Sequence, residues 1–313
     1  MLRKTILITG SKGLIGSALR ECLTKLGFVV KGLDLAYPLN HPEHGDIQDM
    51  PFFSHLAADC SGIIHLAGVS RVITAQQDPD RCWRMNVEGT QKILEMAYQA
   101  KHKPWVLYAS SREVYGQQDT LPVSETVALL PLNVYARSKV AAEQSVETYR
   151  AKGLQTAVLR FSNVYGSIHD HADRVIPAFC RAAALGGTIR IDGSDNIFDF
   201  SHVDDVVKGI IAVIHALQKG SYDLPSMHLT TGRGTTLAEA ATLAKQCSKQ
   251  ALSFLEAPSR SFDVHTFYGD PSLAARVLGW SAAITLEQGM AGLIKAFEDV
   301  LEPQVMTENS RVA

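Results

Sequence analysis

The sequence lacks long hydrophobic runs, closely spaced cysteine pairs and an excess of either charge. No stretch approaches the ~20 consecutive apolar residues of a membrane-spanning helix. The N-terminal segment has neither the apolar core nor the small-residue cleavage site of a secretion signal. Five cysteines are scattered over 313 residues without a CxxC pair, so a disulfide framework is not expected. We therefore expect reduced thiols and a cytoplasmic protein.

The charges nearly balance, with 30 Lys and Arg against 32 Asp and Glu and a formal net charge of -2. No positive excess is present to neutralise a phosphate backbone or an anionic membrane, so neither nucleic acid nor a membrane is an expected partner. The chain is 46% hydrophobic, which at 313 residues suffices for a large core without a stabilising metal. We expect no metal site.

Short apolar runs of strand length alternate with longer segments of helical period up to about residue 160. The runs are 5–9, 28–34, 62–66, 105–109 and 156–160, and the amphipathic segments are 14–26, 82–100 and 135–151. This alternation indicates βαβ units and a parallel sheet buried on both faces. The predicted fold class is α/β, a doubly wound parallel Rossmann sheet with a smaller mixed α/β substrate-binding cap domain.

The pattern also predicts how the chain divides. A dinucleotide-binding domain is expected over 1–165, with a return to it at about 196–225. The cap is expected over 166–195 and 226–301, and includes a helix at 175–185. Residues 302–313 are polar and without period, which predicts a flexible tail.

A glycine-rich turn follows the first predicted strand and opens the first helix. Gly10, Gly13 and Gly16 would let the backbone approach a pyrophosphate, which then lies on the free N–H groups at the helix start. Asp34 ends the second strand, near the ~20-residue spacing of a ribose-binding acid. Its carboxylate repels a 2′-phosphate and favours NAD over NADP, although Lys12 in the turn could pair with such a phosphate.

Three side chains form a candidate catalytic set. Tyr135 and Lys139 are four residues apart and share one face of a predicted helix. A nearby ammonium lowers the pKa of a phenol, which makes the tyrosine a general base for an alcohol proton. Ser111, at the end of the fourth predicted strand, could hydrogen-bond the reacting oxygen.

These features and several others resemble one enzyme family along residues 4–300. The matching segments are GxxGxxG at 10–16, Asp34, GDI at 45–47, HLAG at 65–68, NVEGT at 86–90, SS at 110–111 with VYG at 114–116, YxxxK at 135–139, LRFSNVYG at 159–166 and HVDD at 202–205. Together they look like the extended short-chain dehydrogenase/reductases, and more narrowly the NAD-dependent epimerase/dehydratase branch that acts on nucleotide sugars.

The resemblance implies a role for each matching residue and a homodimer that forms through two helices per subunit, one bearing Tyr135 and Lys139. The implied catalytic residues are Ser111, Tyr135 and Lys139. The implied cofactor-binding residues are Gly10, Gly13, Leu14, Ile15, Gly16, Asp34, Asp46, Ile47, Leu66, Ala67, Gly68, Asn86, Tyr135 and Lys139. The implied or candidate substrate-binding residues are Ser111, Arg112, Glu113, Asn163, Arg174, Arg190 and Arg260.

The first departure from the family pattern is Phe198, which stands where the family usually has an arginine that binds the substrate diphosphate. A phenyl ring cannot make the charged hydrogen bonds that a diphosphate needs. Either Arg174, Arg190 and Arg260 hold a nucleotide sugar in another way, or the substrate is smaller, such as a sugar acid. Phe198 could also simply be part of the core.

The second departure is Arg112 before Glu113, where family dehydratases often carry Asp-Glu. Glu113 fits as a base, but arginine cannot give up a proton at working pH, which disfavours dehydration by that mechanism. Arg112 could bind a substrate carboxylate, as on a uronic acid, or it could face solvent as an ordinary loop cation. Of these two, we expect the loop cation.

The predicted function is an NAD-dependent nucleotide-sugar epimerase that works through a transient 4-keto sugar. The alternatives are an NAD-dependent dehydrogenase of a sugar acid or another non-nucleotide sugar, a nucleotide-sugar dehydratase, and a dinucleotide-binding sensor without catalysis.

Overall fold

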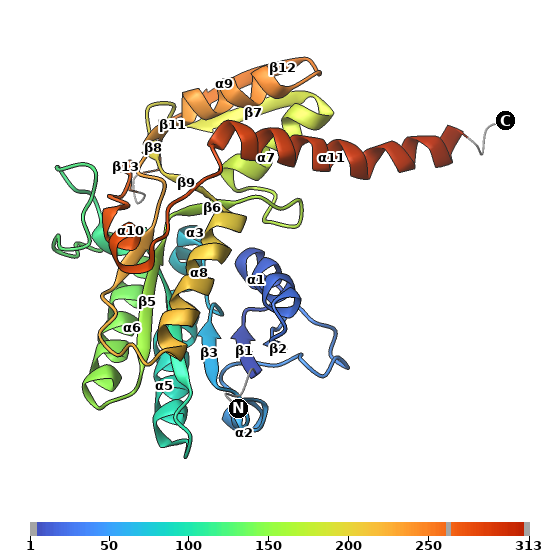
Figure 1. The fold of residues 1–313 in the computed structure, drawn as a ribbon. Helices are drawn as coiled ribbons and strands as arrows, with labels where there is room; N and C mark the ends of the chain where they lie inside the picture. Colours follow the sequence, from blue (N-terminus) through green and yellow to red (C-terminus); the bar gives the residue numbers. More distant parts are fainter. Residues whose placement is uncertain (1–4, 261–263, 310–313) are drawn as a thin grey trace.

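Six parallel strands form the central sheet of the computed structural model, which describes residues 5–260 and 264–309. The spatial order is β10-β5-β4-β3-β1-β2, of which Figure 1 labels β5, β3, β1 and β2. The strands are β1 (Thr5–Thr9), β2 (Val29–Leu33), β3 (Gly62–His65), β4 (Trp105–Ser111), β5 (Thr156–Phe161) and β10 (Met227–Leu229). The order changes direction between β1 and β3, and this switch point is where a doubly wound sheet binds its ligand. The predicted doubly wound parallel sheet is confirmed.

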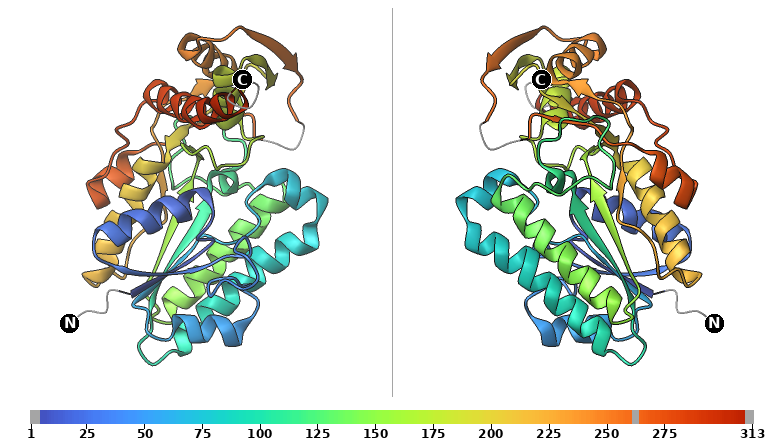
Figure 2. Two further views of the ribbon diagram at one scale, coloured as in Figure 1. Left: turned by 90° about the vertical axis from the view of Figure 1, so that its right-hand side faces the viewer. Right: turned by 90° about the vertical axis from the view of Figure 1, so that its left-hand side faces the viewer.

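Helices cover both faces of the sheet, which is why its strands are apolar on both sides. α1 (Leu14–Lys25) and α8 (Val203–Gln218) lie on one face. α2 (Met50–Ala57), α5 (Gly89–Gln99) and α6 (Val134–Ala151) lie on the other (Figure 2). All seven residues of β4 are buried between these layers.

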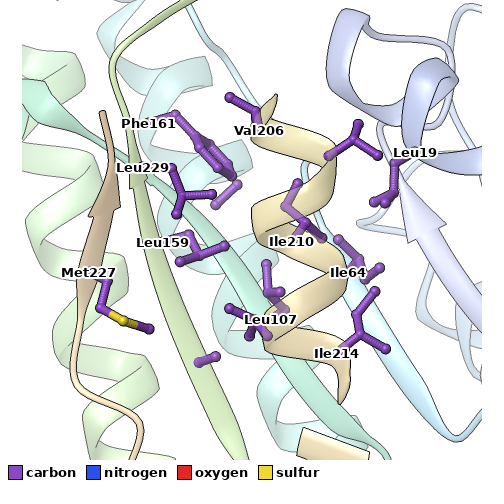
Figure 3. Packing of buried hydrophobic residues seen from close by; sticks show 14 of the residues in the cluster. Leu19, Ile64, Leu107, Leu159, Phe161, Val206, Ile210, Ile214, Met227 and Leu229 are labelled. Carbon is purple, nitrogen blue, oxygen red and sulfur yellow. The ribbon is translucent and has the colours of Figure 1, made fainter. Parts of the chain in front are cut away.

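The apolar core between the sheet and α8 is continuous from β3 to β10 (Figure 3). Val206, Ile210 and Ile214 project from α8 at helical spacing into the same apolar cluster as Leu159 and Leu229 on the strands. All five of these side chains are 0% exposed. This packing holds the strands rigidly, so the loops at their carboxyl ends have defined positions.

Between β3 and β4 the chain is more divided than its periodicity predicted. Two short helices, α3 (Val72–Gln77) and α4 (Pro79–Trp83), lead into a π-helical turn, η1 (Arg84–Glu88), and then α5. The sequence pattern predicted one helix over 82–100 and neither α2 nor α3. The π-helical turn contains Asn86, and such turns are frequent at functional sites.

The remaining elements form a cap above the carboxyl edge of the sheet (Figures 1 and 2). Its own core lies among α7 (Val175–Leu185), α9 (Leu237–Cys247) and α11 (Leu286–Asn309). β7 (Gly187–Asp192) pairs with β12 (Leu252–Ala257), and β6 (Asn163–Tyr165) pairs with β9 (Phe200–His202). A small sheet joins β11 (Thr235–Thr236), β8 (Ile197–Phe198) and β13 (Thr266–Phe267).

Three predicted boundaries are wrong. Residues 227–229 are β10 of the main sheet, although 226–301 was assigned to the cap. α10 (Ser272–Leu278) packs on α8, and Ala274 and Trp280 belong to the core of the main sheet. Residues 302–309 continue α11 where a tail was predicted, and 310–313 lie outside the described residues. None of the described helices has the length and apolar character needed to cross a membrane.

Candidate active site

The glycine turn between β1 and α1 leaves no room for side chains. Gly10 has a φ of +71°, and a Cβ on Gly16 would lie 2.2 Å from the Gly10 carbonyl oxygen. α1 begins after Gly13 without a side-chain cap, so within the described residues the first helical N–H groups, such as those of Leu14 and Ile15, have no side-chain partner. A dinucleotide pyrophosphate requires a backbone that it can approach closely and helix N–H groups that are free to bind it. The residues present therefore fit the predicted cofactor.

Asp34, directly after β2, is tied to this turn. One oxygen of its carboxylate accepts a hydrogen bond of 2.9 Å from the Lys12 N–H. Of the cations beside it, Arg20 is paired with Glu43, and the Lys12 ammonium lies 5.3 Å from the centroid of the Tyr37 ring. A carboxylate at this point accepts hydrogen bonds from ribose hydroxyls and repels a 2′-phosphate. The arrangement suits NAD.

Leu66, Ala67 and Gly68 form the loop after β3, on the other side of the switch point. Asn86 holds this loop from behind: its amide oxygen accepts from the Val69 N–H at 2.8 Å and its amide nitrogen donates to the Val69 carbonyl at 3.0 Å. Asn86 is 1% exposed. Its side chain thus positions the loop, and the cofactor contact that the resemblance implies for it stays a prediction.

Asp46 and Ile47 lie in the loop after β2 and differ in surroundings. The Asp46 carboxylate accepts from the Gln48 N–H at 2.9 Å and is partly exposed. Ile47 is 2% exposed and belongs to the core beneath α5, where a Cβ on Gly89 would lie 2.7 Å from it. The implied contact of both residues with adenine stays a prediction.

Ser111, Tyr135 and Lys139 come together at the carboxyl end of β4. Ser111 is the last residue of that strand, and Tyr135 and Lys139 lie one turn apart on α6, which packs against it. The Lys139 ammonium donates to the Ala109 carbonyl at 2.9 Å and lies 5.8 Å from the centroid of the Tyr135 ring. The structure therefore assembles the three predicted catalytic side chains at one place.

Burial dominates the electrostatics of this set. It raises the pKa of Tyr135 to about 12, and the hydrogen bond with Ser111 and the positive charge of Arg174 offset it only in part. Burial also lowers the pKa of Lys139 to about 8. The sequence predicted that Lys139 brings the pKa of Tyr135 toward neutrality. In this structure the loss of hydration outweighs the interactions with Ser111 and Arg174 that lower the pKa of Tyr135.

Arg112 is buried, so the expectation of a solvent-facing loop cation is wrong. Its side chain is 9% exposed, and Nη2 lies 2.9 Å from Oε1 of Glu113. The guanidinium carbon is 4.7 Å from the ring centroid of Phe198 and 5.6 Å from that of Phe267. Nη1 is buried and has no hydrogen-bond partner among the described residues.

The other four predicted substrate residues divide into two groups. Asn163 begins β6 and lies two residues after Phe161, which is the neighbour of Ser111 in the sheet register. The amide nitrogen of Asn163 is buried without a hydrogen-bond partner in the described part of the chain. Arg174 precedes α7 and acts electrostatically on Tyr135.

Arg190 and Arg260 instead meet at Asp192 in the cap. The Arg190 Nε lies 2.7 Å from one carboxylate oxygen of Asp192, and the Arg260 Nη2 lies 3.6 Å from the other. The Arg190 side chain is 66% exposed and points away from the cap core, which contains its strand neighbours Ile189 and Ile191.

Sequence reasoning missed two residues of the site. Asn133 caps α6 by accepting from the Ala136 N–H at 2.8 Å, and its amide donates to Glu113 at 3.1 Å. An asparagine just before a helical segment is a recognisable N-cap signal, so this residue could have been found. Phe267 has no such signal, because only the register of β13 beside β8 brings it against Arg112.

A buried phenol and ammonium beside a dinucleotide cradle are the working parts of the short-chain dehydrogenase/reductases, and the fold places the protein in that class. The chain belongs to the NAD dependent epimerase/dehydratase family, whose sequence model matches residues 6–224. The predicted family and its NAD dependence are confirmed.

Known relatives and solved structures agree with this assignment. The UDP-glucose 4-epimerase of Lactobacillus helveticus is 29% identical over 88% of this chain and 91% of its own length. UDP-glucuronate 4-epimerase 5 of Arabidopsis thaliana is 28% identical over 93% of this chain and 74% of its own length. MoeE5, solved with UDP-glucose and NAD, superposes with a TM-score of 0.85 at 29% identity, covering 95% of this chain and 99% of that chain. MoeE5 has also been solved with UDP-glucuronic acid and NAD.

Proposed function

We propose that this protein is an NAD-dependent epimerase that inverts C4 of a nucleotide sugar through a transient 4-keto sugar. The observation that carries the proposal is the assembly of Ser111, Tyr135 and Lys139 beside the dinucleotide cradle, in a chain of this family. Relatives named as UDP-glucose and UDP-glucuronate 4-epimerases support the reaction type and the substrate class.

The chain's own residues have distinct tasks in this reaction. Ser111 and Tyr135 hold the reacting hydroxyl of the sugar, and the Tyr135 oxygen, in its phenolate form, receives the proton of that hydroxyl and later returns it. Lys139, anchored on the Ala109 carbonyl, keeps a positive charge beside the phenol at pH values below its pKa of about 8. Gly10, Gly13 and Asp34 would hold NAD, which when bound supplies the acceptor and donor of hydride.

The product distinguishes this reaction from its alternatives. Incubation with NAD and either UDP-glucose or UDP-glucuronate should give a product of unchanged mass with inverted C4, read by NMR, and no accumulating NADH. Steady accumulation of NADH would instead identify a dehydrogenase, and loss of the mass of one water would identify a dehydratase.

Replacing Tyr135 by phenylalanine tests the proposed base. We expect turnover to fall by about 100- to 10,000-fold, with NAD binding kept, because only the proton acceptor is removed. Tyr222→Phe is the matched control, since Tyr222 is 55% exposed and outside the site. Undiminished turnover in Tyr135→Phe would contradict the assignment, and a wild type that binds NAD but converts no sugar would favour a sensor.

We further propose a homodimer that forms through α5 and α6. The support is a hollow of about 690 Å³ on this face, lined largely by apolar atoms of residues such as Met50, Met96 and Tyr149. Light scattering at micromolar protein should give twice the mass of the chain, and Met96→Glu should shift it to one chain. A wild type of single-chain mass would refute the dimer.

A cytoplasmic location is also proposed. The support is that none of the five cysteines, all of which lie in the described part of the chain, forms a disulfide, and that three of them are buried, as expected in a reducing compartment. Fractionation of the source cells should place the protein with other cytoplasmic enzymes, and recovery in an exported fraction would contradict this.

A further inference from the structure

Arg112 has an unusual environment for an arginine in a loop. Its side chain is 9% exposed, its Nη2 is paired with Glu113, and its Nη1 is buried with no partner in the described residues. A buried charged donor without an acceptor is unfavourable, and native proteins keep few of them. An acceptor supplied by a ligand would remove this penalty.

The position of Arg112 places such a ligand group near the reacting carbon. Arg112 directly follows Ser111, whose hydroxyl bonds Tyr135. Its partner Glu113 is held by Asn133, the cap of the helix that carries Tyr135, and the charge of Glu113 acts on Tyr135. These links tie Arg112 and its ion-pair partner to the side chains that would hold the reacting hydroxyl of the sugar.

Two aromatic rings complete the surroundings of the guanidinium. Phe198 and Phe267 are direct neighbours on β8 and β13, and their rings lie 4.7 and 5.6 Å from its central carbon. Such rings interact favourably with a cation and exclude water, and a charged hydrogen bond is stronger where water is excluded. Phe198 thus packs against a guanidinium that belongs to the opposite domain.

The local charges favour an anion. Arg112, Arg174 and Lys139 bring three positive charges to the surroundings of Tyr135. Glu113 and Asp170, which pair with the two arginines, bring two negative charges, so one positive charge is in excess. A carboxylate accepts from a guanidinium through a charged hydrogen bond, whereas a neutral hydroxymethyl group offers one weaker acceptor.

We propose that Nη1 of Arg112 binds a carboxylate on the sugar ring, so that the preferred substrates are nucleotide-linked uronic acids. This inference rests on the proposed function, because it names the substrate class of the same site. It makes Arg112 a specificity-determining residue, separate from the proton transfer at Tyr135.

The test compares UDP-glucuronate with UDP-glucose, which differ in the group attached to C5. Wild type should show a kcat/KM about 10- to 100-fold higher for the uronate, the range expected of one charged hydrogen bond. Arg112→Gln should lose that preference while its kcat/KM for UDP-glucose changes much less. Arg112→Lys, which keeps the charge beside Glu113 but not the planar fork, should recover part of it.

Controls and binding data separate the possible outcomes. Arg181→Gln removes an exposed arginine from α7 and should leave the preference unchanged. Equal use of both sugars by wild type, or equal losses on both in Arg112→Gln and Arg112→Lys, would overturn the inference while leaving the epimerase intact.

Calorimetric titration of the NAD-loaded protein gives a readout independent of turnover. Tighter binding of UDP-glucuronate that depends on Arg112, without conversion of either sugar, would support the inference and refute the epimerase. Binding of free glucuronate as tight as that of UDP-glucuronate would show that the nucleotide is not recognised, and would overturn the nucleotide-linked substrate class.

Discussion

Lys139 carries its charge inside the protein, and this predicts a pH-dependent stability that Lys139→Met should abolish. Burial lowers the pKa of Lys139 from 10.5 to about 8. As pH rises through 8, the folded protein releases this proton before the unfolded chain does, so the wild type becomes more stable. The gain in stability is complete only at pH values above the pKa of Lys139 in the unfolded chain. Lys139→Met lacks this gain, because methionine has no ionisable proton.

The size of the effect follows from the two pKa values. Integrating the linkage relation between pH ~7 and pH ~9.5, with pKa values of about 8 folded and 10.5 unfolded, gives a gain of about 2 kcal/mol. The difference in unfolding free energy between wild type and Lys139→Met should increase by this amount, whatever the effect of the substitution at neutral pH.

Urea denaturation followed by intrinsic fluorescence, on protein freed of nucleotide, measures this difference at a series of pH values. Lys101→Met is the matched control, because Lys101 is exposed and its charge is hydrated in both the folded and the unfolded chain. Its difference from wild type should stay constant. A flat difference for Lys139→Met as well would refute the reasoning, since it would mean that burial does not disfavour the charged lysine.

Three further predictions test the cofactor cradle, the buried ion pair beneath the site and the Phe198 position. Gly16→Ala should lose NAD binding in a fluorescence titration, because its Cβ would lie 2.2 Å from a carbonyl of the same turn, whereas Gly292→Ala, with nothing within 4 Å, should bind normally. Glu143→Ala should reduce the free energy of unfolding by ~3–5 kcal/mol, because it leaves Arg160 buried without its bidentate partner. The double variant Glu143→Ala with Arg160→Met should recover much of this loss. Equal urea midpoints for the single and the double variant would contradict the prediction. Phe198→Arg should lower both the thermal midpoint and the activity, because it places a second guanidinium against one already buried; a gain in turnover would show that the diphosphate needs an arginine there.

The main fold was predictable because its signals are local. Each strand of the sheet up to β5 is a short apolar run, and each βαβ unit is encoded by the alternation of two periods. β10 was not predicted, since it is three residues long and is recognisable only from its pairing with β5. The end of the cap also failed as a prediction, because α10 and Trp280 pack against the main sheet through contacts that periodicity does not reveal.

The candidate catalytic residues were predicted from spacing and resemblance, since a turn of helix brings Tyr135 and Lys139 to one face whatever surrounds them. Their electrostatics could not be predicted in the same way. The pKa of a buried group depends on how much water the whole structure removes from it, and here that removal outweighs the neighbouring charge.

The sequence by itself determined the class of the sheet, the dinucleotide cradle and the identity of the side chains available for proton transfer, because these depend on neighbours within a few residues. Only the tertiary structure decided where Arg112 lies. Its surroundings come from η2 (Arg112–Tyr115), β8 and β13, which are far apart in the chain and meet through the packing of the cap on the sheet. Burial is a property of that packing, so a residue that the sequence predicts to be a solvent-facing loop cation is buried and paired with Glu113 in the folded protein.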